Sequence, residues 1–264
     1  MKKRVLISFD VEEFDLPREH GGKISVEEGV KVSGEGLKRI LELLKQKKVK
    51  ATFFVTGNFA EEVPDLVKRM VKEGHEIGCH GVDHFCPKKT DVEKSKEIVE
   101  KIAGVKVVGW RQPRMFEISY NELKRCGYQY DSSINPAFIP GRYNNASVPR
   151  RSFMKKGILE IPTSVTSMRV PLFWLALHLF PLSVYVRLAR NALKKTGYFA
   201  TYFHPWEFVD LGDYGEVPSY IKRNAGKALV KRLGMVIDEL KKDGGEFMTY
   251  AEFSEKQICR KRGN

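Results

Sequence analysis

The sequence predicts an α/β protein in which repeated β-α units build a parallel sheet. Segments rich in β-branched and apolar residues alternate with segments of helical period, and 42% of the 264 residues are hydrophobic, which is enough for a full core. A chain of this length can form one large α/β barrel or two ordinary domains. Because no repeat, low-complexity stretch or Pro/Gly/Ser-rich boundary divides it, we expect one domain over residues 1–264, with an apolar insert around 168–190.

The predicted elements alternate regularly through the first half of the chain. A strand is expected at 5–10, and the segment after it carries Leu37, Ile40, Leu41 and Leu44 at the spacing of one helix face. The next elements are a strand at 51–55, a helix around 66–71 that ends at Gly74, a strand at 76–79, a helix near 92–102 and a strand near 107–110. A helix therefore connects each strand to the next, as parallel pairing requires.

The second half continues this alternation with shorter units, which cover 121–131 and 158–161. A further strand is expected at 199–203, before a long helix and a last strand at Phe247. The apolar face of that helix is formed by Leu229, Leu233, Val236, Ile237 and Leu240. Two stretches, 135–156 and 170–186, show no clear period and are expected to be insertions.

The composition excludes several classes of protein. Disordered chains, collagen-like repeats and disulfide-stapled miniproteins do not have this balance of residues, and the four cysteines form no CxxC pair, so reduced thiols are expected. The formal charge of +13 predicts attraction to an anionic partner such as nucleic acid, acidic lipid or a phosphorylated substrate. The first apolar run stops at Asp10, too early for a signal peptide, and we expect a cytoplasmic protein.

Polar side chains follow five of the predicted strands, at the point where each strand ends. They are Asp10 and Glu12 after the first strand, His80 and His84 after the third, Arg111 after the fourth, Asp131 after the fifth, and His204 after the strand at 199–203. The carboxyl ends of the strands of a parallel barrel face one mouth, where active sites are built. We therefore expect these side chains to form one site.

Four of these side chains have the spacing of a metal site with a base beside it. Asp10 and Glu12 are two residues apart, so they share a face if the strand continues through them. His80 and His84 are four residues apart, which is one helical turn. One carboxylate and two histidines leave an open position on the ion, as in catalytic rather than structural zinc sites, and the second carboxylate is free to act as a base.

Each of these residues also has a purely structural explanation. The histidine pair could be solvated or hydrogen-bonded, Asp10 could cap a loop, Arg111 could form a structural salt bridge, His204 could be a core histidine, and the neighbouring Glu13 and Asp15 are expected in solvent. The joint placement at successive strand ends favours the functional interpretation.

Six segments between residues 8 and 208 form longer motifs, and MTYAEF, which ends at residue 253, closes the region. ATFFVTG at 51–57 and GHEIGCHGVDH at 74–84 are highly specific, and SFDVEEF at 8–14, GWRQPRMF at 109–116, GYQYDSSI at 127–134 and YFHPWEF at 202–208 accompany them. On these motifs the chain resembles the polysaccharide deacetylases with a NodB-homology domain, of the carbohydrate esterase family 4 type. Its DVE-type first motif and HPWE-type last motif look like those of a subgroup associated with exopolysaccharide and glycolipid loci. The resemblance implies a distorted (β/α) barrel of seven or eight strands.

The resemblance also implies a role for each residue at the strand ends. Asp10 would be the general base, His80 and His84 metal ligands, His204 the general acid, Arg111 the partner of the Asp10 carboxylate, and Asp131 the residue that orients the His204 imidazole. Most of the family has a metal-ligating Asp directly after the base, whereas this chain has Val11, so Glu12 is expected as the third ligand.

The activity that the resemblance implies is metal-dependent hydrolysis of an N-acetyl group, with zinc as the expected divalent ion. The substrate would be an N-acetylated sugar in a glycan, glycolipid or nucleotide-linked precursor. Two alternatives stay open: hydrolysis of another cyclic or linear amide on the same fold, and a non-catalytic carbohydrate-binding relative, which Val11 suggests. We expect no nucleic-acid partner, because no helix-turn-helix, zinc finger, RRM or long basic arm occurs.

The apolar segment has two interpretations. LFWLALHLF, at 172–180, could pack as a buried helix over the barrel mouth. Alternatively, it could form a peripheral contact with an anionic membrane at its inner face, through Phe173, Trp174, Leu175 and Leu179 flanked by Arg169, Arg187 and Arg190. With Pro171, Pro181 and His178 within it, the segment is not expected to span the membrane.

Overall fold

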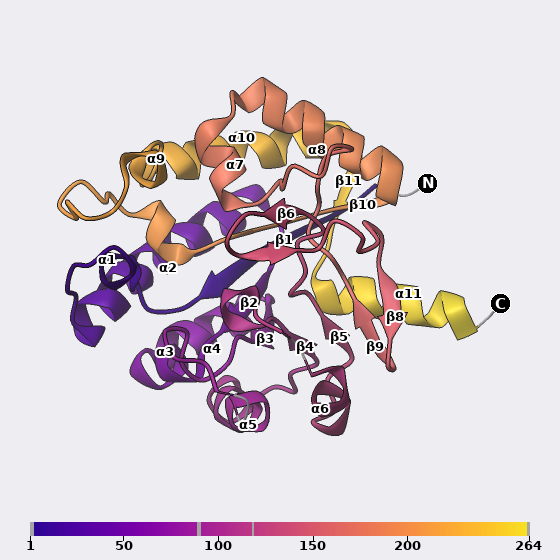
Figure 1. The fold of residues 1–264 in the computed structure, drawn as a ribbon, viewed down its shortest axis with the longest axis horizontal. Coiled ribbons are helices and arrows are strands. Elements are labelled where there is room, and N and C mark those ends of the chain that lie inside the picture. Colours follow the sequence, from indigo (N-terminus) through magenta and orange to yellow (C-terminus); the bar gives the residue numbers. More distant parts are fainter. Residues whose placement is uncertain (1–2, 89–90, 118, 263–264) are drawn as a thin grey trace.

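A nine-stranded sheet forms the centre of the protein, in a computed structural model that describes residues 3–88, 91–117 and 119–262 (Figure 1). The strand order is β10-β1-β2-β3-β4-β5-β9-β8, and β11 also pairs with β1. The strands are β1 (Lys3–Val11), β2 (Thr52–Val55), β3 (Glu76–Cys79), β4 (Gly109–Trp110), β5 (Tyr130–Asp131), β8 (Phe153–Lys155), β9 (Ile158–Glu160), β10 (Tyr198–Phe203) and β11 (Gly245–Phe247). The described pairings are parallel except that of β8 with β9.

The sheet curls into a distorted barrel, so that the two edges of the sheet approach each other. Ser164, after β9, donates a backbone hydrogen bond to the Ala200 carbonyl of β10 at 2.9 Å, and the Tyr198 hydroxyl donates to the Pro162 carbonyl at 2.9 Å. These contacts connect the segment after β9 to β10, the strand at the other edge of the sheet. The α/β distorted-barrel fold class predicted for the sequence is confirmed.

Helices surround this sheet, with α7, α8 and α10 along one side and α3, α4 and α5 along the opposite side (Figure 1). They are α1 (Leu16–Glu19), α2 (Val26–Lys47), α3 (Gly57–Glu62), α4 (Pro64–Lys72), α5 (Asp91–Ala103), α6 (Tyr120–Arg125), α7 (Trp174–Leu179), α8 (Leu182–Thr196), α9 (Ser219–Lys222), α10 (Lys227–Lys242) and α11 (Tyr250–Arg262), with 3-10 turns η1 (Pro113–Met115) and η2 (Pro205–Phe208). No helix in the described ranges is long and apolar enough to cross a membrane.

The predicted periodicities correspond to the buried faces of these elements. Leu37, Ile40, Leu41 and Leu44 of α2 are buried in one core cluster with Phe9 of β1. The helix begins at Val26, earlier than the apolar face alone suggests, because the Ser25 side chain accepts a hydrogen bond from the Glu28 N–H at its N-terminus. Periodicity thus located the helix, and capping determines where it starts.

The regions without clear period contain short elements that sequence patterning did not predict. The stretch 135–156 contains a small antiparallel pair, β6 (Phe138–Ile139) with β7 (Tyr143–Asn144), and strand β8. The last predicted strand is followed by α11, whose mixed polar composition carries no strong apolar stripe. The apolar segment 170–186 forms α7 and the start of α8, and Pro181 separates the two helices.

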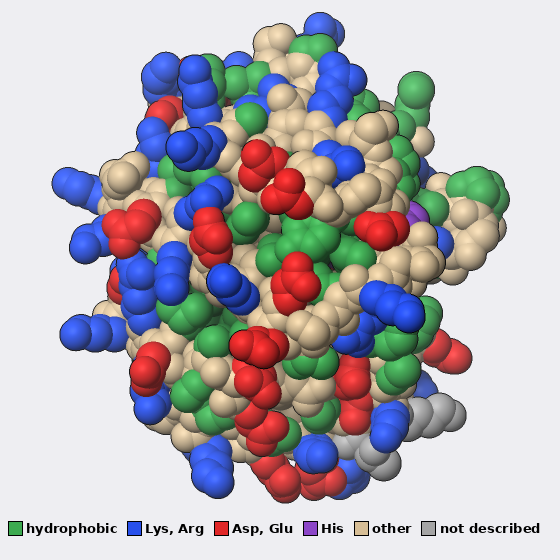
Figure 2. All heavy atoms as spheres, turned by 90° about the vertical axis from the view of Figure 1, so that its left-hand side faces the viewer, with side chains coloured by type: hydrophobic (Ala, Val, Ile, Leu, Met, Phe, Trp, Pro, Cys, Tyr) green, Lys and Arg blue, Asp and Glu red, His purple; other side chains and the backbone are tan. Residues whose placement is uncertain are grey.

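The positive charge does not gather into one surface on the face shown in Figure 2. Lys and Arg side chains are most frequent toward the left of that view but also lie across it, among Asp and Glu side chains and a hydrophobic group in the middle (Figure 2). Arg190, predicted to flank a membrane-facing patch, instead pairs with Asp243 at 2.5 Å and Glu239 at 3.1 Å. Phe173, Trp174, Leu175 and Leu179 are half-buried rather than exposed.

Candidate active site

The residues predicted at the strand ends lie at one end of the sheet. Asp10 is the penultimate residue of β1, with Glu12 directly after the strand, and Arg111 directly follows β4. His80 and His84 follow β3, Asp131 ends β5, and His204 follows β10. Most of these side chains are buried, whereas His84 and His204 are 12% and 13% exposed. The parallel topology therefore brings together residues that are far apart in sequence.

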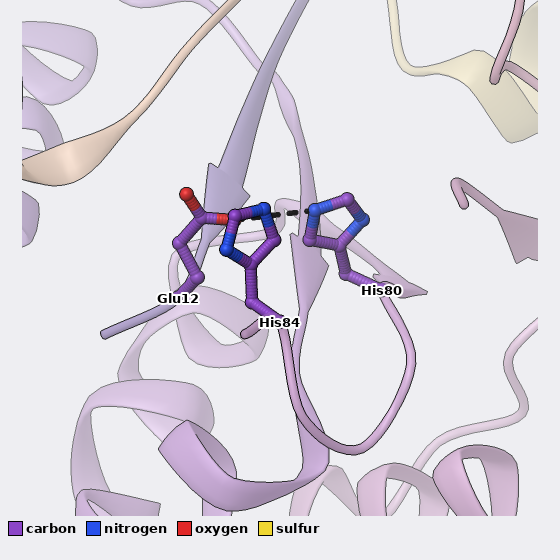
Figure 3. A group of neighbouring side chains, drawn as sticks. All are labelled: Glu12, His80 and His84. Carbon is purple, nitrogen blue, oxygen red and sulfur yellow. Dashed lines mark ion pairs between the residues drawn. The ribbon is translucent and has the colours of Figure 1, made fainter. Parts of the chain in front are cut away.

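Glu12, His80 and His84 point toward one another (Figure 3). Glu12 Oε2 lies 3.3 Å from His80 Nε2 and 3.1 Å from His84 Nε2, and one ligand atom from each residue lies within 4.8 Å of the others. The two histidines lie on the irregular loop after β3 rather than on a helical turn, which corrects the geometry expected from their spacing. The loop nevertheless brings both Nε2 atoms to the same carboxylate oxygen.

Hydrogen bonds at the outer ring nitrogens orient both imidazoles. His80 Nδ1 lies 2.8 Å from the Arg111 carbonyl oxygen, an obligatory acceptor, so this nitrogen carries the proton. His84 Nδ1 lies 3.2 Å from Asp15 Oδ2. Both contacts leave the Nε2 lone pairs facing Glu12, the arrangement that metal-ligating histidines adopt.

These residues fit a divalent cation. Burial raises the pKa of Glu12 to about 7, and its Oε2 atom is buried without a hydrogen bond, despite the two nearby imidazoles. Three converging acceptor atoms with no proton between them are poorly satisfied by one another, whereas a cation would satisfy all three. Two imidazole nitrogens and one carboxylate oxygen are a donor set that suits zinc.

Asp15 supports this cluster and was wrongly expected in solvent. It is buried, and in addition to His84 it contacts Arg114 at 3.3 Å. Arg114 Nε also donates to the His84 carbonyl oxygen at 3.1 Å, so the loop after β4 holds the loop that carries His84. Glu13 is also only half-exposed, and burial raises its pKa to about 7. No sequence pattern points to Asp15, because its partners come from loops after two other strands.

Asp10 and Arg111 form a buried ion pair beside the cluster, as predicted. Arg111 Nη1 donates to Asp10 Oδ1 at 2.6 Å and to Ser8 Oγ at 2.8 Å, and its Nε donates to the Ser132 carbonyl oxygen at 2.8 Å. Burial acts to raise the pKa of Asp10, but the Arg111 guanidinium and neighbouring imidazoles outweigh it and lower the pKa. Asp10 is therefore a carboxylate that can accept a proton within the site.

His204 lies across the cluster from the other imidazoles, with Nε2 4.0 Å from Glu12 Oε1. Its Nδ1 pairs with Glu207 Oε1 at 2.8 Å. The prediction that Asp131 orients this imidazole is wrong, since the partner comes from the same HPWE motif, one 3-10 turn along. Burial acts to lower the pKa of His204, but the Glu207 hydrogen bond and the charges of Glu12 and Asp10 raise it to about 9.

Asp131 has a different environment. Ser133 Oγ donates to Asp131 Oδ1 at 2.5 Å and accepts from the Gln112 N–H at 2.7 Å, which ties the loops after β5 and β4 together. Glu160 of β9 lies beside Asp131, and burial together with the Asp131 charge raises the pKa of Glu160 far above its usual range. Asp131 therefore holds the loops of the site in position and does not orient the His204 imidazole.

The chain is similar in sequence to known polysaccharide deacetylases. Residues 2–130 match the family model of polysaccharide deacetylase. The chain is 38% identical over 117 residues to the peptidoglycan-N-acetylmuramic acid deacetylase PdaA of Bacillus subtilis, covering 40% of this chain and 44% of that protein. It is 41% identical over 93 residues to a peptidoglycan-N-acetylglucosamine deacetylase of Bacillus cereus, covering 33% and 34%. The chain thus matches less than half the length of these two relatives.

Solved structures share the fold. A candidate polysaccharide deacetylase of Mycobacterium smegmatis has a TM-score of 0.68 at 18% identity, covering 98% of this chain and 91% of that one. A carbohydrate esterase family 4 pseudoenzyme of Bacillus anthracis has a TM-score of 0.53 at 16% identity, covering 96% and 66%. The first half of the chain is thus similar to polysaccharide deacetylases in sequence, and the whole chain shares their fold.

Proposed function

We propose that the protein is a metal-dependent N-deacetylase that removes acetyl groups from an N-acetylated sugar. The observation that carries this proposal is the juxtaposition of the buried Asp10–Arg111 pair with the Glu12, His80 and His84 cluster. A binding protein has no need for a buried carboxylate held ionised beside a candidate metal site. We also place the chain in the subgroup with a DVE-type first motif, because Glu12 takes the position in the cluster that Val11, buried in the core, does not.

Asp10 is the proton acceptor in this mechanism. When a water molecule attacks the acetyl carbonyl carbon, a new C–O bond forms and Asp10 takes the proton of that water. Arg111 holds the carboxylate in place and favours its charged form before the attack. A divalent ion held by Glu12, His80 and His84 would supply a lowered water pKa and a polarised carbonyl.

His204 is the proton donor to the leaving amine. As the C–N bond breaks, its electron pair goes to nitrogen, which takes the proton from His204 Nε2, and the products are acetate and the amino sugar. Glu207 holds Nδ1, so Nε2 faces the cluster. The raised pKa of His204 supplies the protonated form at neutral pH.

A cleft beside the site supports a proposal about the substrate class. It has a volume of about 610 Å³ and lies next to His84, because Arg114 both lines it and contacts the His84 carbonyl. Arg142 and Lys155 also line it, together with one carboxylate, Glu117, and among the described residues neither cation takes part in an ion pair. Phe116 and Tyr143 add aromatic surface. We infer that the substrate carries an anionic group, as a nucleotide-linked or lipid-phosphate-linked sugar does.

Acetate release and metal content, measured together, test the proposed activity. We expect Asp10→Asn to keep bound zinc and lose most acetate release, because it removes only the base. His80→Ala should lose both zinc and activity. The wild-type protein stripped with a chelator should regain activity when zinc is returned. Full activity of Asp10→Asn would refute the mechanism, and a wild type that binds zinc and sugar but releases no acetate would favour a non-catalytic relative.

A substrate panel tests the anionic-group inference separately. The wild type should release acetate faster from a nucleotide-linked N-acetyl sugar than from a neutral N-acetylglucosamine oligomer. Arg142→Ala should reduce that preference by raising KM for the anionic substrate alone. Equal rates on both sugars would remove the anionic group from the proposal, and acetate-free hydrolysis of a cyclic or linear amide would favour the alternative amide substrate.

A further inference from the structure

The apolar segment contributes a further buried imidazole next to the site. His178 on α7 is fully buried, and its Nε2 lies 2.8 Å from Glu207 Oε2. The other oxygen of the same carboxylate, Oε1, holds His204 Nδ1 at 2.8 Å. Glu207, also fully buried, thus lies between two imidazoles, one at the candidate catalytic cluster and one within the insert. In Figure 1, α7 lies on the same side of the sheet as α8 and α10.

The hydrogen-bond partners determine which nitrogens of His178 carry protons. Nδ1 lies 2.6 Å from the Arg223 carbonyl oxygen, which can only accept, so Nδ1 is a donor. Nε2 faces a carboxylate oxygen, which also accepts when ionised. With Nδ1 donating to the carbonyl, a hydrogen bond to Glu207 requires a proton on Nε2 as well, so His178 donates from both ring nitrogens in this arrangement.

Aromatic rings and a hydrogen bond from Asn224 surround these contacts and fix them in place. Trp174 packs edge-on against both His178 and His204, with ring centroids 5.9 Å and 5.6 Å away, and Trp206 stacks on His204 at 4.9 Å. Asn224 donates to the His178 carbonyl oxygen at 2.7 Å, which fixes the end of α7. In such a low-dielectric environment, a charged hydrogen bond determines orientation more strongly than it does in water.

We propose that His178 is a positioning residue for proton delivery, which acts through Glu207 to hold His204 with Nδ1 donating and Nε2 facing the metal cluster. The segment around 168–190 is apolar because it must bury this charged pair over the mouth of the barrel. The inference rests on the proposed deacetylase function, and it assigns to α7 a part in the reaction rather than in membrane contact.

Two acetyl substrates of different leaving-group chemistry test the proposal. An N-acetyl sugar needs a proton on its departing amine, whereas an aryl acetate ester loses a phenolate that leaves without one. We expect His178→Phe to lower kcat for the amide about 100-fold with KM unchanged, while ester hydrolysis stays within about threefold of the wild type. His178→Gln, which keeps a neutral donor toward Glu207, should recover about tenfold of the lost amide activity. Zinc content should be unchanged in both variants.

Leu177→Ala is the matched control, because Leu177 is the fully buried neighbour on the same helix and makes no side-chain hydrogen bond. It should destabilise α7 and change the amide and ester rates equally. Equal loss of both rates in His178→Phe, or a wild-type amide rate, would overturn the proposal. A wild type inactive on every N-acetyl sugar would instead refute the proposed function.

A measurement on the unaltered protein keeps the proposal testable if the variants do not fold. The ¹⁵N chemical shifts of His178 at neutral pH should show both ring nitrogens protonated, with a coupling to the Glu207 carboxylate. An Nε2 atom without a proton would lack the donor to Glu207 and would overturn the proposal.

Discussion

Gly36 is the position where a single methyl group should disturb the active site from outside it. This residue lies on α2, where the helix packs against η2, and a Cβ atom at position 36 would lie 1.8 Å from the Pro205 carbonyl oxygen. Pro205 directly follows His204. Real Cβ atoms do not approach other atoms closer than 3.0 Å, so Gly36→Ala must displace backbone by the difference from 1.8 Å, at least about 1.2 Å.

We expect this displacement to lower kcat/KM for acetate release about 100-fold, because a shift of about 1 Å at a catalytic group costs about that much. The effect on stability should be smaller. Overpacking costs about 1–3 kcal/mol, and the helix propensity of alanine offsets about 1 kcal/mol of it, so urea unfolding should show a net loss of about 0–2 kcal/mol. The loss of kcat/KM should therefore be larger than the loss of unfolding free energy can explain.

Gly34→Ala is the control on the same helix. A Cβ atom there meets Leu66 Cδ1 at 3.7 Å, an ordinary van der Waals distance. This variant should gain about 1 kcal/mol of unfolding free energy and keep wild-type activity. If Gly36→Ala were as active as Gly34→Ala, the close approach of α2 to η2 would not control the position of His204, and the reasoning would be refuted.

Two further variants test buried titratable groups, one away from the site and one within it. Burial, with Lys50 nearby, lowers the pKa of His75 from 6.5 to about 4. The unfolded chain therefore binds the proton more readily than the folded protein does. The free energy of unfolding should fall by up to about 3 kcal/mol as the pH drops from about 6.5 to 4. In urea titrations, the free energy of unfolding of His75→Asn should not show this fall with pH. A pH dependence equal to that of the wild type would contradict its assignment to His75. Arg111→Met should lose about 3–5 kcal/mol, because it leaves the Asp10 carboxylate buried without its partner, and the double variant with Asp10→Asn should lose less than the two single losses added. Additive losses would contradict a buried pair.

The part of the site that could be predicted from sequence depends on topology alone. Asp10, Glu12 and Arg111 lie at or just beyond strand ends, and parallel pairing places those ends at one mouth whatever the intervening helices do. Alternation along an extended chain was sufficient to place Glu12, rather than Val11, toward the histidines. Predictions of this kind succeed because they require only strand order and side-chain direction.

The partner of His204 could not be predicted in this way. Asp131 lies at a strand end like the other site residues, yet the imidazole pairs with Glu207, three residues along the same motif. A spacing of three residues brings the two side chains together only because residues 205–208 form a 3-10 turn, which directs the Glu207 side chain back to His204. The supporting residue Asp15 was missed for a similar reason, because loops after β3 and β4 fold over it.

The apolar segment shows why composition alone leaves a functional element ambiguous. A run of Phe, Trp and Leu is compatible with a membrane surface and with a cover over a buried site, since both remove apolar side chains from water. His178 favours the cover, because an imidazole that is fully buried must find partners, and these partners are Glu207 and the Arg223 carbonyl. A polar residue inside an apolar run is therefore the informative one, and here it leads from the insert directly to the proton donor of the proposed reaction.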